Sequence, residues 1–237
     1  MTNPRDHLVL SLDLDRLDDA RALARPLAPW FATAKVGYEL YAAAGPDVID
    51  ALHNDGFAVF LDLKLLDIPT TVERGARVIG RRGADFLNLH TVGGLDMLRA
   101  GVAGLADGAR SGGHAPPVAL GVTVLTSEPN ADAVPERLEL ARQSGCDGVV
   151  CAAAEAGAAA TLGLAPMVPG VRLAGGPAND QARVATPGDA IRAGARWLVV
   201  GRTVTAAPDR QAAATQAAAE VEAALAELPT ASRPGVA

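Results

Sequence analysis

The strongest constraint on the fold is a repeated alternation between short β-rich runs and longer segments of helical period. Eight apolar runs occur along the chain, and Ala/Leu/Arg-rich segments with helical spacing separate them. The runs are continuously apolar, which is typical of parallel strands covered by helices. Eight such units predict an α/β fold of the closed (β/α)₈ type, a TIM barrel. The expected strands are residues 7–13, 32–37, 58–64, 86–91, 118–124, 148–153, 165–171 and 197–202.

The main alternative architecture is a doubly wound open sheet. That fold would need a glycine-rich turn after the first strand, and residues 13–15 of this chain read DLD. The length of 237 residues suits one barrel, so we expect a single catalytic domain over residues 1–228. Residues 104–117 are rich in glycine and proline, and we expect a loose connection there. We expect a disordered tail at residues 229–237.

Composition argues against several classes of function. Aromatic residues make up 3% of the chain and its formal net charge is -6, so we expect neither base-stacking platforms nor basic patches, and no nucleic-acid partner. No apolar run approaches the roughly 18 residues that cross a bilayer. Acidic residues occur near the start of the chain, where a signal peptide would have its apolar core. We therefore expect a cytoplasmic protein with no membrane partner. Cys146 and Cys151 lack CxxC spacing and are expected to be buried packing residues.

Lysine is almost absent from this chain. Of 21 basic residues only Lys35 and Lys64 are lysines, and both lie at the carboxyl ends of expected strands, on the face that carries the active site in barrels. An ammonium group can give up a proton and a guanidinium effectively cannot, so arginine cannot replace lysine where a proton is transferred. Two surface lysines retained by chance are the alternative, and their common position favours function.

Aspartates surround these two lysines in the expected barrel. Asp62 and Lys64 are two residues apart on one strand, which points both side chains to the same side, and Asp67 follows in the loop. Asp13 ends the first strand in the same way. Partly desolvated charges persist only when they pair, and neighbouring carboxylates favour protonated lysines. A structural ion-pair network is the alternative, but placement at the strand ends favours a catalytic array.

A second group of residues follows the seventh and eighth expected strands, where barrels commonly bind phosphate. Glycines let backbone N–H groups approach phosphate oxygens, and an arginine can donate two parallel charge-assisted hydrogen bonds. Glycines are also ordinary turn residues, so the prediction of a phosphate site depends on the arginines. The group consists of Gly170, Arg172, Gly175, Gly176, Gln181, Gly201 and Arg202.

Polar residues after the fifth expected strand can bind the edge of a polar ring. Thr126 and Ser127 supply hydroxyls there, which is a weak signal by itself. His90 ends the fourth strand, and we expect it to order the following loop. No set of histidines and acids has the spacing of a metal site, so we expect neither a metal ion nor a cofactor.

Together these residues resemble the orotidine 5′-phosphate decarboxylase family in its bacterial form. The segment Asp62-x-Lys64-x-x-Asp67-Ile-Pro-x-Thr71 is similar to the family signature, and the other landmarks follow in the family's order over roughly residues 7 to 210. Leu66 and Thr70 depart from the bacterial pattern, in which histidine and asparagine are common at these positions. We expect little consequence of these departures for catalysis.

The resemblance implies decarboxylation of orotidine 5′-phosphate (OMP) to UMP in pyrimidine biosynthesis, without metal or cofactor. Lys64 would lie beside C6 of the pyrimidine and protonate it, within an array with Lys35 and Asp62. The family's counterpart of Asp67 comes from the partner subunit, so a homodimer with two shared sites is implied. The implied substrate contacts are Thr126 and Ser127 for the base, Asp13, Lys35 and Thr71 for the ribose, and Gln181, Arg172, Gly201 and Arg202 for the phosphate.

Two other functions remain open. A Mg²⁺-dependent sugar-phosphate decarboxylase or aldolase of the same superfamily shares the Asp-x-Lys-x-x-Asp motif. Such enzymes place a glutamate ligand near the end of the second strand, where this chain has Lys35, a cation in the place of a metal ligand. A non-catalytic barrel that only binds a nucleotide is the other alternative, and it would not need two lysines among aspartates.

Overall fold

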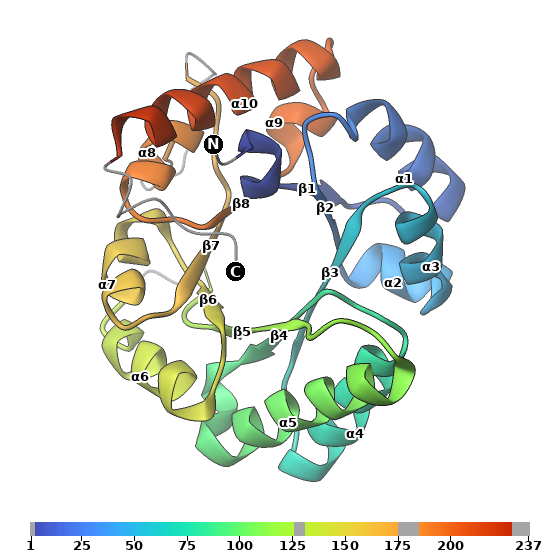
Figure 1. The fold of residues 1–237 in the computed structure, drawn as a ribbon, viewed down its shortest axis with the longest axis vertical. Helices are drawn as coiled ribbons and strands as arrows, with labels where there is room; N and C mark the ends of the chain where they lie inside the picture. The colour runs from blue at the N-terminus through green and yellow to red at the C-terminus, as the bar shows by residue number, and fades with distance from the viewer. Residues whose placement is uncertain (1–2, 126–130, 175–184, 229–237) are drawn as a thin grey trace.

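The expected (β/α)₈ barrel is confirmed by the computed structural model, which describes residues 3–125, 131–174 and 185–228. Eight parallel strands close into a barrel in sequence order, with β8 paired to β1, and the helices lie around the outside (Figure 1). The tail expected to be disordered, residues 229–237, lies outside the described residues. The strands are β1 Leu8–Leu12, β2 Thr33–Val36, β3 Ala58–Leu65, β4 Phe86–His90, β5 Val118–Val122, β6 Gly148–Val150, β7 Ala165–Pro169 and β8 Trp197–Val200.

At least one helix follows each strand, and β2 and β8 are each followed by two. Short 3-10 turns complete some of the connections: η1 Pro4–His7, η2 Arg25–Leu27, η3 Thr91–Gly93 and η4 Ala153–Glu155. The α-helices are α1 Leu17–Ala24, α2 Tyr38–Ala44, α3 Asp47–Asn54, α4 Pro69–Arg81, α5 Gly94–Gly112, α6 Val134–Ser144, α7 Ala156–Thr161, α8 Pro187–Arg192, α9 Arg202–Thr205 and α10 Arg210–Glu227.

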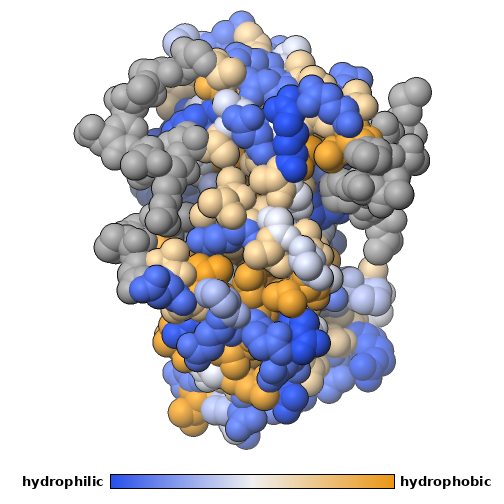
Figure 2. All heavy atoms as spheres, turned by 90° about the vertical axis from the view of Figure 1, so that its left-hand side faces the viewer, coloured by the Kyte–Doolittle hydropathy of each residue, from blue (hydrophilic) through white to orange (hydrophobic). Residues whose placement is uncertain are grey.

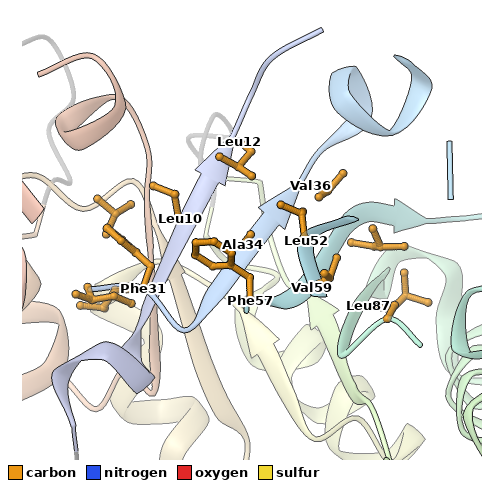
Figure 3. Packing of buried hydrophobic residues seen from close by; sticks show 14 of the residues in the cluster. Leu10, Leu12, Phe31, Ala34, Val36, Leu52, Phe57, Val59 and Leu87 are labelled. Atoms are coloured by element: carbon orange, nitrogen blue, oxygen red, sulfur yellow. The ribbon is translucent and has the colours of Figure 1, made fainter. Parts of the chain in front are cut away.

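Side chains of the strands alternate between two apolar cores. One core lies between the barrel and its helices, and Figure 3 shows part of it, with Leu10, Ala34 and Val59 from neighbouring strands packed among helix and loop residues. The other fills the barrel interior, where Phe86 makes edge-to-face contacts with Phe60 and Trp197, at centroid distances of 6.2 and 5.1 Å. Because side chains alternate along a strand, the next inward position of β3 after Phe60 is residue 62, towards the carboxyl end of the barrel.

The loose connection expected over residues 104–117 is wrong for most of its length. Helix α5 continues to Gly112, so only residues 113–117 link it to β5. The glycines serve close packing: a Cβ added at Gly104 or Gly108 would overlap the backbone carbonyl of Glu73 or Arg77 in α4. Glycine therefore lets two helices approach backbone to backbone here, which a local sequence pattern does not distinguish from a flexible turn.

The surface is mixed in polarity on the flank that carries α7, where hydrophilic residues are interspersed with hydrophobic ones (Figure 2). Within the described ranges, no helix is both long enough and apolar enough to span a bilayer. Both cysteines are buried, as expected from their spacing.

Candidate active site

Four charged side chains meet at the carboxyl ends of β1, β2 and β3. The Nζ atom of Lys35 lies 3.3 Å from Oδ1 of Asp13 and 3.3 Å from Oδ2 of Asp62. The Nζ atom of Lys64 lies 2.5 Å from Oδ1 of Asp62. The four residues therefore form a line of alternating charge, Asp13–Lys35–Asp62–Lys64, which we call the charged array. The charged array differs from an ordinary surface ion pair because Lys35 is only 8% exposed.

The centre of the charged array is Asp62. Burial by itself would raise the pKa of this carboxyl, but the charges of Lys35 and Lys64 lower it, as do hydrogen bonds from Lys64 and Asn88. The net effect holds the pKa of Asp62 below its ordinary value. Asp62 is thus a carboxylate at neutral pH, in contact with the Nζ atoms of both lysines.

The backbone at Lys64 is unusual. Lys64 has φ of 44°, and no other non-glycine residue in the described ranges has a positive φ. Two-residue alternation places Lys64 on the same side as Asp62. At the same point of the strand, the pairing of β3 with β4 shifts register between Leu61 and Leu65. A left-handed backbone is costly for a side chain other than glycine, and such strain gathers at functional sites.

A buried asparagine missed by the sequence analysis lies next to this backbone. Asn88 of β4 is fully buried. Its Oδ1 accepts a hydrogen bond of 2.7 Å from the backbone N–H of Lys64, and its Nδ2 donates one of 2.7 Å to Oδ1 of Asp62. The sequence signal that could have indicated this residue is the single amide side chain inside the apolar run FLNLH. A polar group buried in a strand needs a hydrogen-bond partner, so its position points to a specific contact.

A cavity of about 140 Å³ opens beside the charged array. Its lining combines the charged side chains of β2 and β3 with apolar residues that come mainly from the opposite strands. A ligand in it would meet cations and a carboxylate on one side and an apolar wall on the other. The lining includes Lys35, Asp62, Lys64, Val122, Leu125 and Pro169.

Comparison with known proteins decides the family. The model of the "Orotidine 5'-phosphate decarboxylase / HUMPS family" matches residues 6–217. The chain belongs to this family. It is 43% identical to the orotidine 5′-phosphate decarboxylase of Anaeromyxobacter sp. (strain K), over 91% of this chain and 98% of the relative. It is 45% identical to that of Chromohalobacter salexigens, over 87% of this chain and 92% of the relative.

Solved structures agree with this assignment. The crystal structure of orotidine 5′-phosphate decarboxylase from Lactobacillus acidophilus superimposes with a TM-score of 0.76 at 33% identity, covering 91% of this chain and 99% of that one. The enzyme from Pyrococcus horikoshii OT3 gives a TM-score of 0.73 at 25% identity, with coverage of 91% and 99%. The likeness extends along nearly the whole length of those proteins.

Two residues of the family signature lie away from the charged array within this chain. Asp67 is exposed, and its Oδ1 accepts a hydrogen bond of 2.7 Å from the backbone N–H of Ile68 just before α4. Thr71 is exposed in the first turn of that helix. Across the described ranges, Asp67 forms no ion pair with Lys35 or Lys64.

The structure describes some of the residues predicted to bind the substrate's phosphate and base, and not others. Arg172 is half-buried three residues after β7, where its backbone N–H donates to the carbonyl oxygen of Ala185 at 3.1 Å. Gly201 directly follows β8 and Arg202 begins α9, with its side chain exposed. Strands β7 and β8 are neighbours, so these loops lie at adjacent positions of one rim. Thr126, Ser127, Gly175, Gly176 and Gln181 lie outside the described residues.

His90 has the role expected of it. Its Nδ1 accepts a hydrogen bond of 3.3 Å from the backbone N–H of Val92 in η3. This bond orders the turn that leads from β4 into α5.

Proposed function

We propose that this member of the family decarboxylates OMP to UMP without a metal ion or organic cofactor, and that Lys64 is the acid that protonates C6. The observation that carries the proposal is the charged array, which holds an ammonium group against Asp62 beside the cavity. Family membership and the relatives' activity support the choice of substrate.

The proposed chemistry needs a cation that is also an acid. When the bond between C6 and the carboxylate breaks, CO₂ leaves and the electron pair stays on an sp² carbon with no conjugated sink. The ammonium group of Lys64 stabilises that charge through space and then gives a proton to C6. The resulting amine regains its proton from solvent. Asp62 keeps the ammonium group in place throughout.

The remaining residues are proposed to bind parts of the substrate remote from C6. Contacts to the phosphate contribute binding energy that can order loops and close the site around the reacting carbon. The proposed contacts are Thr126 and Ser127 for the base, Asp13, Lys35 and Thr71 for the ribose, and Arg172, Gln181, Gly201 and Arg202 for the phosphate.

A homodimer with shared sites is part of the proposal. Large apolar side chains are exposed near Asp67, among them Leu66 at 52%, Ile68 at 67% and Tyr38 at 63%. Tyr38 joins this region because its hydroxyl donates a hydrogen bond of 2.6 Å to the carbonyl oxygen of Leu63. An exposed apolar patch of this kind marks a contact surface. Covering it with a second subunit would carry Asp67 to the partner's charged array.

Substitution of Lys64 tests the acid directly. Lys64→Ala should lower the turnover of OMP by more than about a hundredfold, the lower end of what general acid catalysis contributes. Lys64→Arg is the matched control for charge, because arginine keeps the cation but does not release a proton. Both variants should show this loss of turnover while keeping the wild-type circular dichroism spectrum. Turnover by Lys64→Arg near the wild-type rate would reject proton transfer from this residue.

Two further assays separate the alternatives. Activity on OMP should survive EDTA, whereas a loss restored by Mg²⁺ would favour the metal-dependent sugar-phosphate enzyme. Absence of any turnover would favour a nucleotide-binding barrel.

Mixing subunits tests the shared site. Equal amounts of Lys64→Ala and Asp67→Ala chains, unfolded and refolded together, should regain about a quarter of the wild-type sites. Half of the dimers are then mixed, and each mixed dimer has one intact site. Each variant refolded alone is the control, and no gain on mixing would contradict sharing through Asp67.

A further inference from the structure

We infer that Asn88 is a positioning residue for the decarboxylation, holding Lys64 and its counter-ion Asp62 in a single arrangement. The inference rests on the proposed role of Lys64 and adds a residue on a different strand. Three observations carry it: the strand register, the hydrogen bonds of the amide, and the backbone of Lys64.

The register leaves Asn88 alone opposite three residues. Leu61 pairs with Leu87 and Leu65 pairs with Leu89, so residues 62–64 of β3 face only Asn88 on β4. A regular ladder would place one residue opposite one, and the excess on β3 forms a bulge. Bulges leave backbone groups without their ladder partners. The side chain of Asn88 supplies the missing acceptor for one of them, the N–H of Lys64.

The amide of Asn88 contacts both the backbone of Lys64 and the carboxylate that binds the Lys64 ammonium group. Its Oδ1 binds the backbone of Lys64, and its Nδ2 binds the same Oδ1 atom of Asp62 that accepts the Lys64 ammonium group. The backbone and the charged end of Lys64 are thus tied to each other through Asn88 and Asp62. A carboxamide has an acceptor and a donor side by side, and neither an apolar side chain nor an ionised carboxylate offers both.

The positive φ of Lys64 makes this support necessary. An arrangement that costs free energy locally persists only where its surroundings determine it, and Asn88 is fully buried with both of its polar ends used. Without the amide, the backbone of Lys64 can relax and carry the ammonium group away from C6. A displacement of about 1 Å in a reacting group can lower a rate by about a hundredfold.

The first test compares Asn88→Ala with Ser144→Ala. Ser144 is a matched control because it is also buried, and its hydroxyl donates one hydrogen bond of 2.8 Å to the carbonyl of Ala141 within α6. Asn88→Ala should lower kcat for OMP by about a hundredfold, with KM and the Kd of UMP changed by less than about threefold. Ser144→Ala should keep the wild-type kcat even where its melting temperature falls as far. Equal kcat values for the two variants would overturn the inference.

The second test uses Asn88→Asp, which keeps the shape of the side chain. An ionised Asp at this position can accept from the N–H of Lys64, but it repels Asp62. When protonated it can donate to Asp62 as the amide does. The kcat of Asn88→Asp relative to wild type should therefore rise as the pH falls from 8.5 to 6. A residue that only filled space would give a pH profile parallel to that of wild type, and this result would overturn the inference.

The two proposals fail in different ways. Wild-type turnover of OMP that is lost in Lys64→Ala, together with unaffected Asn88 variants, would reject only the role of Asn88. Full activity of Lys64→Ala would reject the proposed acid and the inference with it. If Asn88→Ala does not fold, the pH profile of Asn88→Asp decides the question by itself.

Discussion

A single methyl group at the contact between α4 and α5 should destabilise the barrel. In Gly108→Ala the added Cβ would lie 2.8 Å from the carbonyl carbon and 2.9 Å from Cα of Arg77, which are backbone atoms that cannot rotate away. Ordinary Cβ contacts begin at 3.4 Å, and the carbonyl oxygen of Arg77 lies closer still to the added Cβ than these two carbons, so the helices must move apart to admit it. Overpacking of this kind costs about 1–3 kcal/mol, and the better helix propensity of alanine offsets about 1 kcal/mol.

The expected net loss of up to about 2 kcal/mol lowers the melting temperature of a chain this long by up to about 8 °C, at about 2–4 °C per kcal/mol. Gly75→Ala is the matched control, because Gly75 is exposed on the same α4 and a Cβ there meets no atom within 4 Å. This control should gain about 0.5–1 kcal/mol. Melting is followed by circular dichroism at one protein concentration, since the proposed dimerisation would shift apparent stability. A Gly108→Ala protein as stable as Gly75→Ala would refute the close packing of these helices.

Further predictions concern titratable groups outside the charged array. The hydrogen bond of 2.8 Å from His53 to Asp85 raises the pKa of His53 above 6.5, so its stabilisation is complete below that pH and is lost as the pH rises through the raised value. His53→Gln should therefore lower the melting temperature more at pH 6 than at pH 9, and an equal effect at both would contradict this. Burial raises the pKa of Cys146 to about 11 and that of Cys151 to about 12. At pH 8 both thiols should resist a disulfide reagent in the native protein and react in urea, so rapid native labelling would show that they are accessible.

The strands were predictable because their sequence signal is local. All eight observed strands lie within one residue of their expected ranges at the amino end, since each is a continuous apolar run that parallel pairing buries on both faces. The carboxyl ends were less predictable: β6 ends at Val150 where residue 153 was expected, and β7 at Pro169 where residue 171 was expected. There the chain leaves the ladder and turns toward the rim, which depends on the neighbouring strands.

Tertiary contacts explain what the sequence could not reveal. Residues 104–112 contain glycines, a local pattern that indicates a flexible link. Their actual role is to let α5 approach the backbone of α4, and this depends on residues distant in the sequence. Asn88 was missed for a similar reason, because its role depends on the register between β3 and β4. Lys35, Asp62 and Lys64 were found because scarce residue types and two-residue spacing are visible in the chain itself.

The two lysines of the charged array are not equivalent, and their difference favours Lys64 as the acid. Lys35 bridges two carboxylates and its side chain is 10% exposed. In the described ranges Lys64 contacts one carboxylate, that of Asp62, and its side chain is 27% exposed. An ammonium group has three N–H donors, so Lys64 retains more of them for a ligand in the cavity that it lines. Lys35 therefore balances Asp13 and the more buried Asp62, whose side chains are 60% and 17% exposed, and Lys64 is the lysine left for the proposed proton transfer.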